Sequence, residues 1–205
     1  MNSYLAKAYA TKMIDDATVL NLQLGAGISD YESKRFLYTG DIAEADYDSW
    51  YLQANVELER SYQMNEKAIL TPFIHADYVY IDVDGYKESG GGALSLEVDD
   101  DSADSLVFGA GLKGNYDVSD KWTLEADAGI GYDVLTDRSN LTSSFVGGGA
   151  NFSTQGIKPD EVVYSAGLGA AYGLDNGGEV TVRYDFNGRE DYTEQYLSVD
   201  LRVPF

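Results

Sequence analysis

Apolar and polar residues alternate with a period of two along much of the chain. The clearest short example places Trp50, Leu52, Ala54, Val56 and Leu58 between the more polar Tyr51, Gln53, Asn55, Glu57 and Glu59. Successive side chains of a β-strand point to opposite faces, so this period is typical of a strand with one apolar and one polar face. The pattern therefore predicts amphipathic strands.

The same alternation recurs often enough to predict about nine strands. The run from Trp122 to Val134 is long enough to cross a bilayer, since a membrane β-strand needs about 9–11 residues. The predicted strands cover residues 4–12, 20–28, 50–59, 69–81, 106–112, 122–134, 164–172, 180–186 and 196–205. Aromatic residues lie near several strand ends, as in the aromatic belts of membrane barrels.

Short and long connections alternate between these strands. The short ones are residues 13–16, 61–67, 117–121 and 173–178, and the long, acidic ones are residues 29–48, 82–104, 135–161 and 187–194. Outer-membrane barrels have short periplasmic turns and longer extracellular loops. The sequence therefore predicts an all-β, antiparallel transmembrane β-barrel in one domain, residues 1–205. Residues 143–153 also resemble strand, and we expect an extramembrane hairpin there.

A count of nine conflicts with the even strand number of single-chain bacterial barrels. We therefore expect at least one more strand N-terminal to this chain, since a first strand without a neighbour would expose unpaired backbone groups to lipid. The segment Met1 to Met13 lacks the apolar core and cleavage site of a signal peptide. We therefore expect the export signal to be encoded elsewhere. No stretch approaches the ~20 apolar residues of a membrane helix.

Composition limits the chemistry. The formal net charge of -21, from 35 acidic and 14 basic residues, opposes binding to nucleic-acid phosphates, so we expect no nucleic-acid partner. Cysteine is absent, which excludes disulfides and thiolate metal sites. His75 is the single histidine and no Gly-x-Ser-x-Gly elbow occurs, so we expect no enzyme and no cofactor. The acidic segments 82–85 and 99–101 lack calcium-loop spacing, and we interpret them as solvated loops without a metal.

Assigning the apolar faces to lipid places a set of polar side chains in the barrel lumen. They are His75, Asp77, Lys113, Glu125, Asp127, Arg183, Asp185, Asp200 and Arg202, with Glu57 and Glu59 beside them. One hypothesis is that they pair across the wall, and the other is that they grip a transiting segment or a plug helix. A simple register places Lys113 opposite Glu125 and Gly109 opposite Gly129. Inward glycines either allow strand curvature or leave room for a polypeptide.

The last ten residues place an apolar row on one face, consisting of Leu197, Val199, Leu201, Val203 and Phe205. This row resembles the C-terminal assembly signal of outer-membrane proteins, which the barrel-assembly machinery reads. The sequence departs from that pattern in two places. Asp200 stands where glycine is usual, and Pro204 has no backbone N–H to donate.

The segment Leu70-Thr-Pro-Phe-Ile-His-Ala-Asp-Tyr-Val-Tyr80, followed by Asp84-Gly-Tyr-Lys-Glu-Ser-Gly90, resembles the translocator domain of autotransporters, which carry out type V secretion. Residues 105–112, 165–172 and 182–189 resemble that family's glycine-rich strands, so the resemblance covers nearly the whole chain. It implies a barrel of about twelve strands in the outer membrane of a Gram-negative bacterium. This chain would begin near the fourth strand, after a lumen helix.

The partners that the resemblance implies are outer-membrane lipid, the barrel-assembly machinery and the protein's own secreted passenger. Two alternatives remain open from the sequence. One is a small stand-alone barrel acting as an adhesin or pore through its acidic loops. The other is an outer-membrane hydrolase, which would have to use His75.

Overall fold

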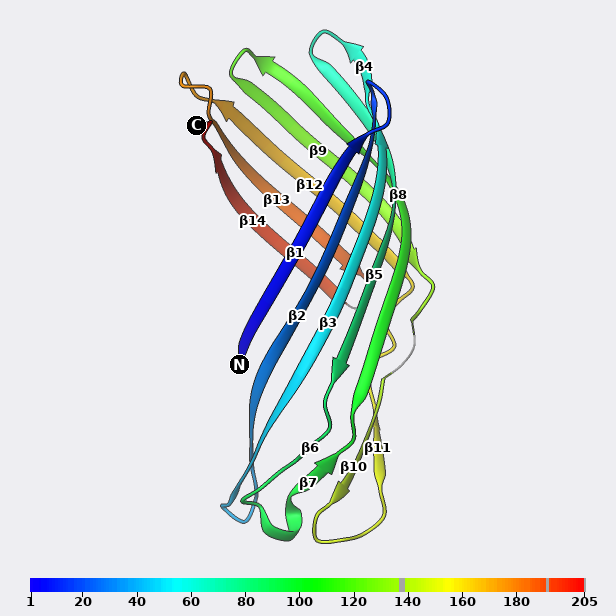
Figure 1. Cartoon of the computed structure of the whole chain (residues 1–205), viewed down its shortest axis with the longest axis vertical. Helices are drawn as coiled ribbons and strands as arrows, with labels where there is room; N and C mark the ends of the chain where they lie inside the picture. The colour runs from blue at the N-terminus through cyan, green and yellow to red at the C-terminus, as the bar shows by residue number, and fades with distance from the viewer. Residues whose placement is uncertain (137–138, 191, 205) are drawn as a thin grey trace.

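The computed structural model describes residues 1–136, 139–190 and 192–204. It confirms the predicted all-β fold and each of the nine predicted strands, which form one antiparallel sheet (Figure 1). In spatial order they are β1 (Asn2–Met13), β2 (Thr18–Phe36), β3 (Ile42–Arg60), β5 (Ala68–Val83), β8 (Asp101–Ser119), β9 (Trp122–Asp133), β12 (Val162–Gly173), β13 (Glu179–Arg189) and β14 (Tyr192–Arg202). The short β4 (Tyr62–Asn65) pairs with β5 beyond the end of its pairing with β3.

The sheet is curled into an open half-barrel, with β1 and β14 at its two edges (Figure 1). Every neighbouring pair in the row of nine is antiparallel. The first and ninth strands of such a row point in the same direction. Antiparallel closure of the gap between β1 and β14 therefore needs an odd number of additional strands.

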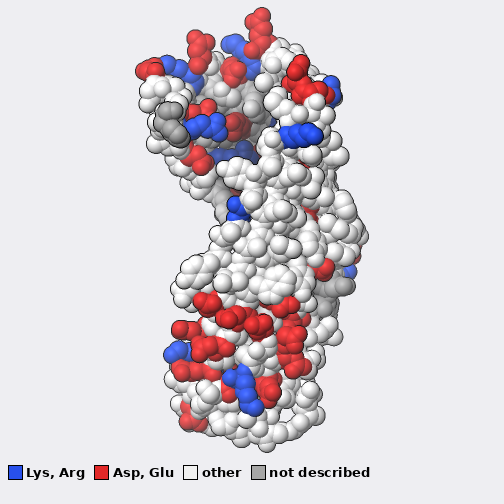
Figure 2. Space-filling view, in the orientation of Figure 1, with Lys and Arg blue, Asp and Glu red and all other residues white. Residues whose placement is uncertain are grey.

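Burial along the strands is inverted relative to a water-soluble protein. On β9, Trp122, Leu124, Ile130 and Tyr132 are 47–62% exposed, whereas the polar residues between them are half-buried. The hydrophobic effect would make such a surface costly in water, so this face suits a lipid environment. Figure 2 shows a belt with few charged residues between two charged ends. Within the described residues, no helix is long and apolar enough to span a membrane.

Several strands extend far beyond a membrane. β2, β3 and β8 each contain 19 residues, about twice the length that a bilayer crossing needs. A second, four-stranded sheet in the order β11-β10-β7-β6 lies at the same end of the molecule. It consists of β6 (Tyr86–Lys87), β7 (Leu96–Val98), β10 (Asn140–Phe145) and β11 (Phe152–Gln155), with the short 3-10 helix η1 (Gly92–Leu94) before β7. The β10–β11 pair confirms the expected hairpin.

Two of the predicted long loops are wrong. Residues 29–48 continue β2 and β3 as a paired ladder up to Phe36 and Ile42, and only residues 37–41 form the turn. Likewise, β13 continues to Arg189 and β14 begins at Tyr192, so most of the loop predicted at residues 187–194 is strand. β2 and β3 exceed the length of a bilayer crossing, so their ends need no apolar face and the alternation fades while backbone pairing continues. The predicted short turn at 61–67 also contains β4, which leaves a turn at residues 66–67.

The predicted register between β8 and β9 is wrong by two residues. Lys113 lies opposite Asp127, and Gly109 lies opposite Gly131. The hairpin is centred on residue 120, one residue later than the predicted pairing implies, and a β-bulge between Asp117 and Ser119 shifts the pairing near the turn. A shift of two residues keeps every side chain on its face, so the assignment of faces is unaffected.

Candidate functional site in the polar inner wall

The first cluster on the concave face is centred on Lys113 of β8. Its ammonium group lies 2.6 Å from Glu57 and 2.8 Å from Glu59, both on β3. The Lys113 side chain therefore reaches across β5, where its nitrogen lies 4.9 Å from the centre of the Phe73 ring. Side chains two strands apart converge on the inside of a curved sheet. Lys113 thus binds two carboxylates on β3, whereas the simple register had placed it opposite Glu125.

The second cluster is centred on Arg183 of β13. Its guanidinium contacts three carboxylates: Asp127, Asp185 at 2.8 Å and Glu125 at 3.7 Å. The charged groups come from β9 and β13, and β12 lies between these two strands. The groups can meet across β12 because it carries Gly167, where a Cβ would collide with the ion pair. Together the two clusters contain five carboxylates and two cations, so the inner wall carries an excess of negative charge.

His75 forms a third group with Asp77, which also accepts a hydrogen bond from Asn55. The imidazole ring covers the backbone of Gly109, where a Cβ would overlap the ring. Gly111 likewise accommodates the Phe73 ring and faces the carbonyl oxygen of Ala128. The inward glycines at these positions therefore make room for neighbouring aromatic rings rather than for an open passage.

Asp200 and Arg202, also predicted to face the lumen, lie apart from these clusters. Both are on β14, opposite Thr181 and Glu179, and both are exposed at the open edge of the sheet. On the other face of β14, Leu197, Val199 and Leu201 are exposed as one apolar row, and Val203, directly after the strand, is exposed as well. Phe205, the last residue of the predicted assembly signal, lies outside the described residues.

A group at the rim was not predicted from the sequence. The Asp133 side chain is 2% exposed and accepts hydrogen bonds from Arg189 at 2.7 Å and Ser105 at 2.6 Å. The backbone N–H groups of Leu106 and Leu135 complete its shell. The group joins β8, β9 and β13 at the end where the strands leave the predicted membrane. Ser105, Asp133 and Arg189 are far apart in sequence. The alternation of apolar and polar residues places Asp133 on the inner face but does not identify its partners.

A second unpredicted ion pair holds the extramembrane sheet. Glu88, with 4% of its side chain exposed, binds Arg35 of the extended β2 and accepts a hydrogen bond from the Leu96 N–H at 2.7 Å. The hydrogen bond from Arg35 holds the pKa of Glu88 below its usual range. Beside it, the rings of Tyr31, Tyr47 and Tyr86 form one stack. These contacts fasten the segment around β6 and β7 to the β2–β3 hairpin.

The side chains of the inner wall offer ion pairing and hydrogen bonding. Among the described residues, no group of three or more histidine or carboxylate side chains is arranged to hold a metal ion. The imidazole of His75 is engaged by Asp77. The arrangement suits contact with a cationic or polar chain that lies in the concavity. Figure 2 shows the hollow, with charged residues around it, in the upper part of the view.

Comparisons with known proteins agree with this geometry. A family model described as the autotransporter beta-domain matches residues 1–185. Esterase EstA from Pseudomonas aeruginosa and its namesake from Pseudomonas putida are each 29% identical over 214 residues. These matches cover 100% of this chain and 33% of each relative. The chain thus spans about a third of the length of these curated relatives.

Two further proteins extend the comparison. The putative surface-exposed virulence protein BigA of Salmonella typhimurium is 27% identical over 137 residues, which cover 65% of this chain and 7% of BigA. Among solved structures, the translocator domain of autotransporter NalP from Neisseria meningitidis is similar with a TM-score of 0.76 and 22% identity. That match covers 99% of this chain and 67% of the NalP chain, and it shows a shared fold.

Proposed function

Since the chain belongs to the autotransporter beta-domain family and is an outer-membrane translocator β-domain, we propose that it brings a passenger segment of its own protein to the cell surface. The family match and the inverted burial of the strands carry this proposal. It is tested by placing an epitope upstream of this segment in the whole protein. Intact cells should display the epitope, and deletion of residues 1–205 should keep it inside. Display without this segment would refute the proposal.

We propose that residues 1–205 form most of one barrel domain, completed by strands and a lumen helix encoded upstream. The parallel directions of β1 and β14 support an odd number of further strands, and three would give the twelve expected from the family. Gel mobility with and without boiling tests this. The chain alone should show no faster unboiled band, whereas the same chain with its upstream segment should. A shift for the chain alone would favour a stand-alone barrel.

The inner wall is the surface that meets the passenger or plug segment. Five carboxylates share two cations there, which favours contact with Lys or Arg side chains of the transiting chain. Replacing Glu57 and Glu125 with glutamine keeps the side-chain shapes but removes two negative charges. Slower surface display is expected for this double variant. Equal display rates at equal barrel levels would mean that the charges only brace the wall.

The apolar row of β14 engages the barrel-assembly machinery, and the outer apolar belt contacts membrane lipid. The exposure of Leu197, Val199 and Leu201 on the edge strand supports this role, because a free strand edge can pair with another protein. Deleting Phe205 should lower membrane insertion, while a Tyr196→Phe substitution on the other face should not. Unchanged insertion after the deletion would remove the signal assignment.

Catalysis, where the whole protein has any, resides outside this segment. The relatives called esterases extend over about three times the length of this chain, which leaves ample room for a separate catalytic domain. Within the chain, Asp77 holds the Nδ1 of His75, and Nε2, the nitrogen that would have to act as a base, lies over the β8 backbone where a Cβ at Gly109 would overlap the ring. His75→Ala in the whole protein should therefore leave ester hydrolysis unchanged. Loss of hydrolysis in a variant that still inserts would overturn this assignment.

A further inference from the structure

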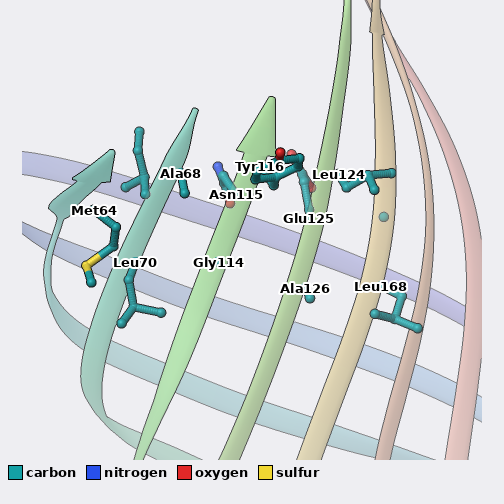
Figure 3. A pocket seen from close by; sticks show the side chains of 12 residues that line it. Met64, Ala68, Leu70, Gly114, Asn115, Tyr116, Leu124, Glu125, Ala126 and Leu168 are labelled. Atoms are coloured by element: carbon teal, nitrogen blue, oxygen red, sulfur yellow. The ribbon is translucent and has the colours of Figure 1, made fainter. Parts of the chain in front are cut away.

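An apolar groove of about 580 Å³ crosses the outer face of the sheet (Figure 3). Four residues on neighbouring strands form a row across the groove: Leu70 pairs with Gly114, Gly114 with Ala126, and Ala126 with Leu168. The two middle residues have little or no side chain, whereas the two end residues stand up as walls. Tyr116 and Leu124 close the side towards the short turns.

Gly114 differs from the inward glycines of the same strand. A Cβ at Gly109 or Gly111 would overlap a neighbouring ring, whereas a Cβ at Gly114 would meet nothing closer than 3.8 Å. Its backbone also lies outside the positive-φ region that favours glycine. Neither packing inside the protein nor backbone conformation therefore requires glycine here. Glycine within a strand often marks the close approach of a ligand, and this one faces away from the protein.

The depth of the groove identifies its surroundings. Trp122 and Tyr172 pack together at the turn end of β9 and β12, where an aromatic belt meets the lipid headgroups. Ala126 lies four residues further along β9, about 13 Å along the strand. With a strand tilt of about 45°, this is roughly 9 Å deeper in the bilayer. The groove therefore lies among acyl chains of the periplasmic leaflet.

We propose that the groove binds one acyl chain of a periplasmic-leaflet phospholipid, so that a single lipid is retained at this site. The proposal rests on membrane insertion of the barrel and extends the proposed function to a specific lipid contact. Continuity with the apolar belt supports an acyl chain as the occupant. At the turn next to the groove, the exposed Lys67 directly precedes the lining residue Ala68 and offers a cation for the lipid phosphate.

Native mass spectrometry of the full-length protein, released from phosphatidylethanolamine nanodiscs, tests the proposal. Wild type should retain one lipid per protein. Gly114→Leu should lose it, because the new side chain projects into the groove from a Cβ that meets nothing closer than 3.8 Å. Ala128→Leu is the matched control, since Ala128 lies on the outer face of the same strand as Ala126 but does not line the groove. It should retain the lipid.

A second variant and an insertion check complete the design. Leu168→Ala removes one wall and should lower lipid retention without adding bulk. Faster gel mobility before boiling shows that each variant has inserted, so failure of insertion is distinguished from failure of lipid binding. Equal retention in Gly114→Leu and Ala128→Leu would overturn the proposal, as would wild type without a lipid. A doubled protein mass lost in Gly114→Leu would identify a second copy as the occupant, and would also overturn it.

Discussion

The rim group around Asp133 predicts a large local effect of Arg189→Met. Removal of the guanidinium leaves a carboxylate that is 2% exposed and that keeps, among the described residues, Ser105 and two backbone N–H groups as donors. Breaking a buried ion pair by removing one partner costs about 3–5 kcal/mol. Because the Arg189 side chain is 20% exposed and water can partly replace it, we expect about 3 kcal/mol, the low end of that range.

Hydrogen exchange measures this loss directly. The Asp133 N–H donates to Glu161 at 2.7 Å, and the Val134 N–H donates to Leu106 at 2.9 Å, so both amides report opening of the rim. A loss of about 3 kcal/mol corresponds to roughly 100-fold faster exchange at these amides, since 1.4 kcal/mol is a factor of ten. Exchange less than about threefold faster would mean that Arg189 is not needed to hold the rim closed.

A matched control separates this buried pair from the exposed ion pair nearby. Lys158 binds Glu161 at 3.0 Å at the surface, where solvent screens the interaction. Lys158→Met should therefore leave exchange at the two rim amides nearly unchanged. A similar acceleration in both variants would mean that any charge change in this region loosens the rim, and would assign no special role to Asp133.

Three further predictions follow from the inner wall and the extramembrane sheet. Gly111→Ala should destabilise the barrel by about 1–3 kcal/mol through overpacking, whereas Gly114→Ala should be neutral or stabilise it by about 0.5 kcal/mol, both measured by denaturant unfolding of the full-length protein. Lys113→Met should cost about 1 kcal/mol at low salt and less at high salt, because its two glutamate partners then repel each other; a salt-independent loss would contradict this. The lowered pKa of Glu88 means that its bond to Arg35 stabilises the fold above pH ~4.3 and is lost as the pH falls further, so exchange of the β6–β7 amides should rise in acid, and Glu88→Gln should show the same rise at pH 7.

Much of the fold is predictable from the sequence because a membrane barrel depends on simple alternation. The run beginning at Trp122 predicted β9 and assigned its apolar residues to the face that the structure leaves exposed. Side chains alternate strictly on a strand, so a register error of two residues left these faces unchanged. The same logic found the hairpin of β10 and β11 in the middle of a long connection.

The contacts between distant strands were not predictable in the same way. The bulge between Asp117 and Ser119 changes pairing along the whole β8–β9 hairpin, and no residue pattern marks it. Lys113 binds carboxylates two strands away only because the sheet is curled. Beyond the membrane, the residues on the two faces of a strand no longer differ in polarity. The sequence therefore predicted a loop where β2 and β3 extend, although their backbones pair throughout.

In the proposed mechanism, the concave face of the sheet meets the exported segment while the apolar face meets lipid. Ile74 and His75 are neighbours on β5, with Ile74 58% exposed on the outer face and His75 on the inner wall. A photo-crosslinking amino acid at each position, in the whole protein during export, compares the two faces directly. Position 75 is predicted to crosslink to the protein's own upstream segment and position 74 to lipid. Equal crosslinking of the upstream segment at both positions, or crosslinking of that segment only at position 74, would show that the concave face is not the surface that meets it.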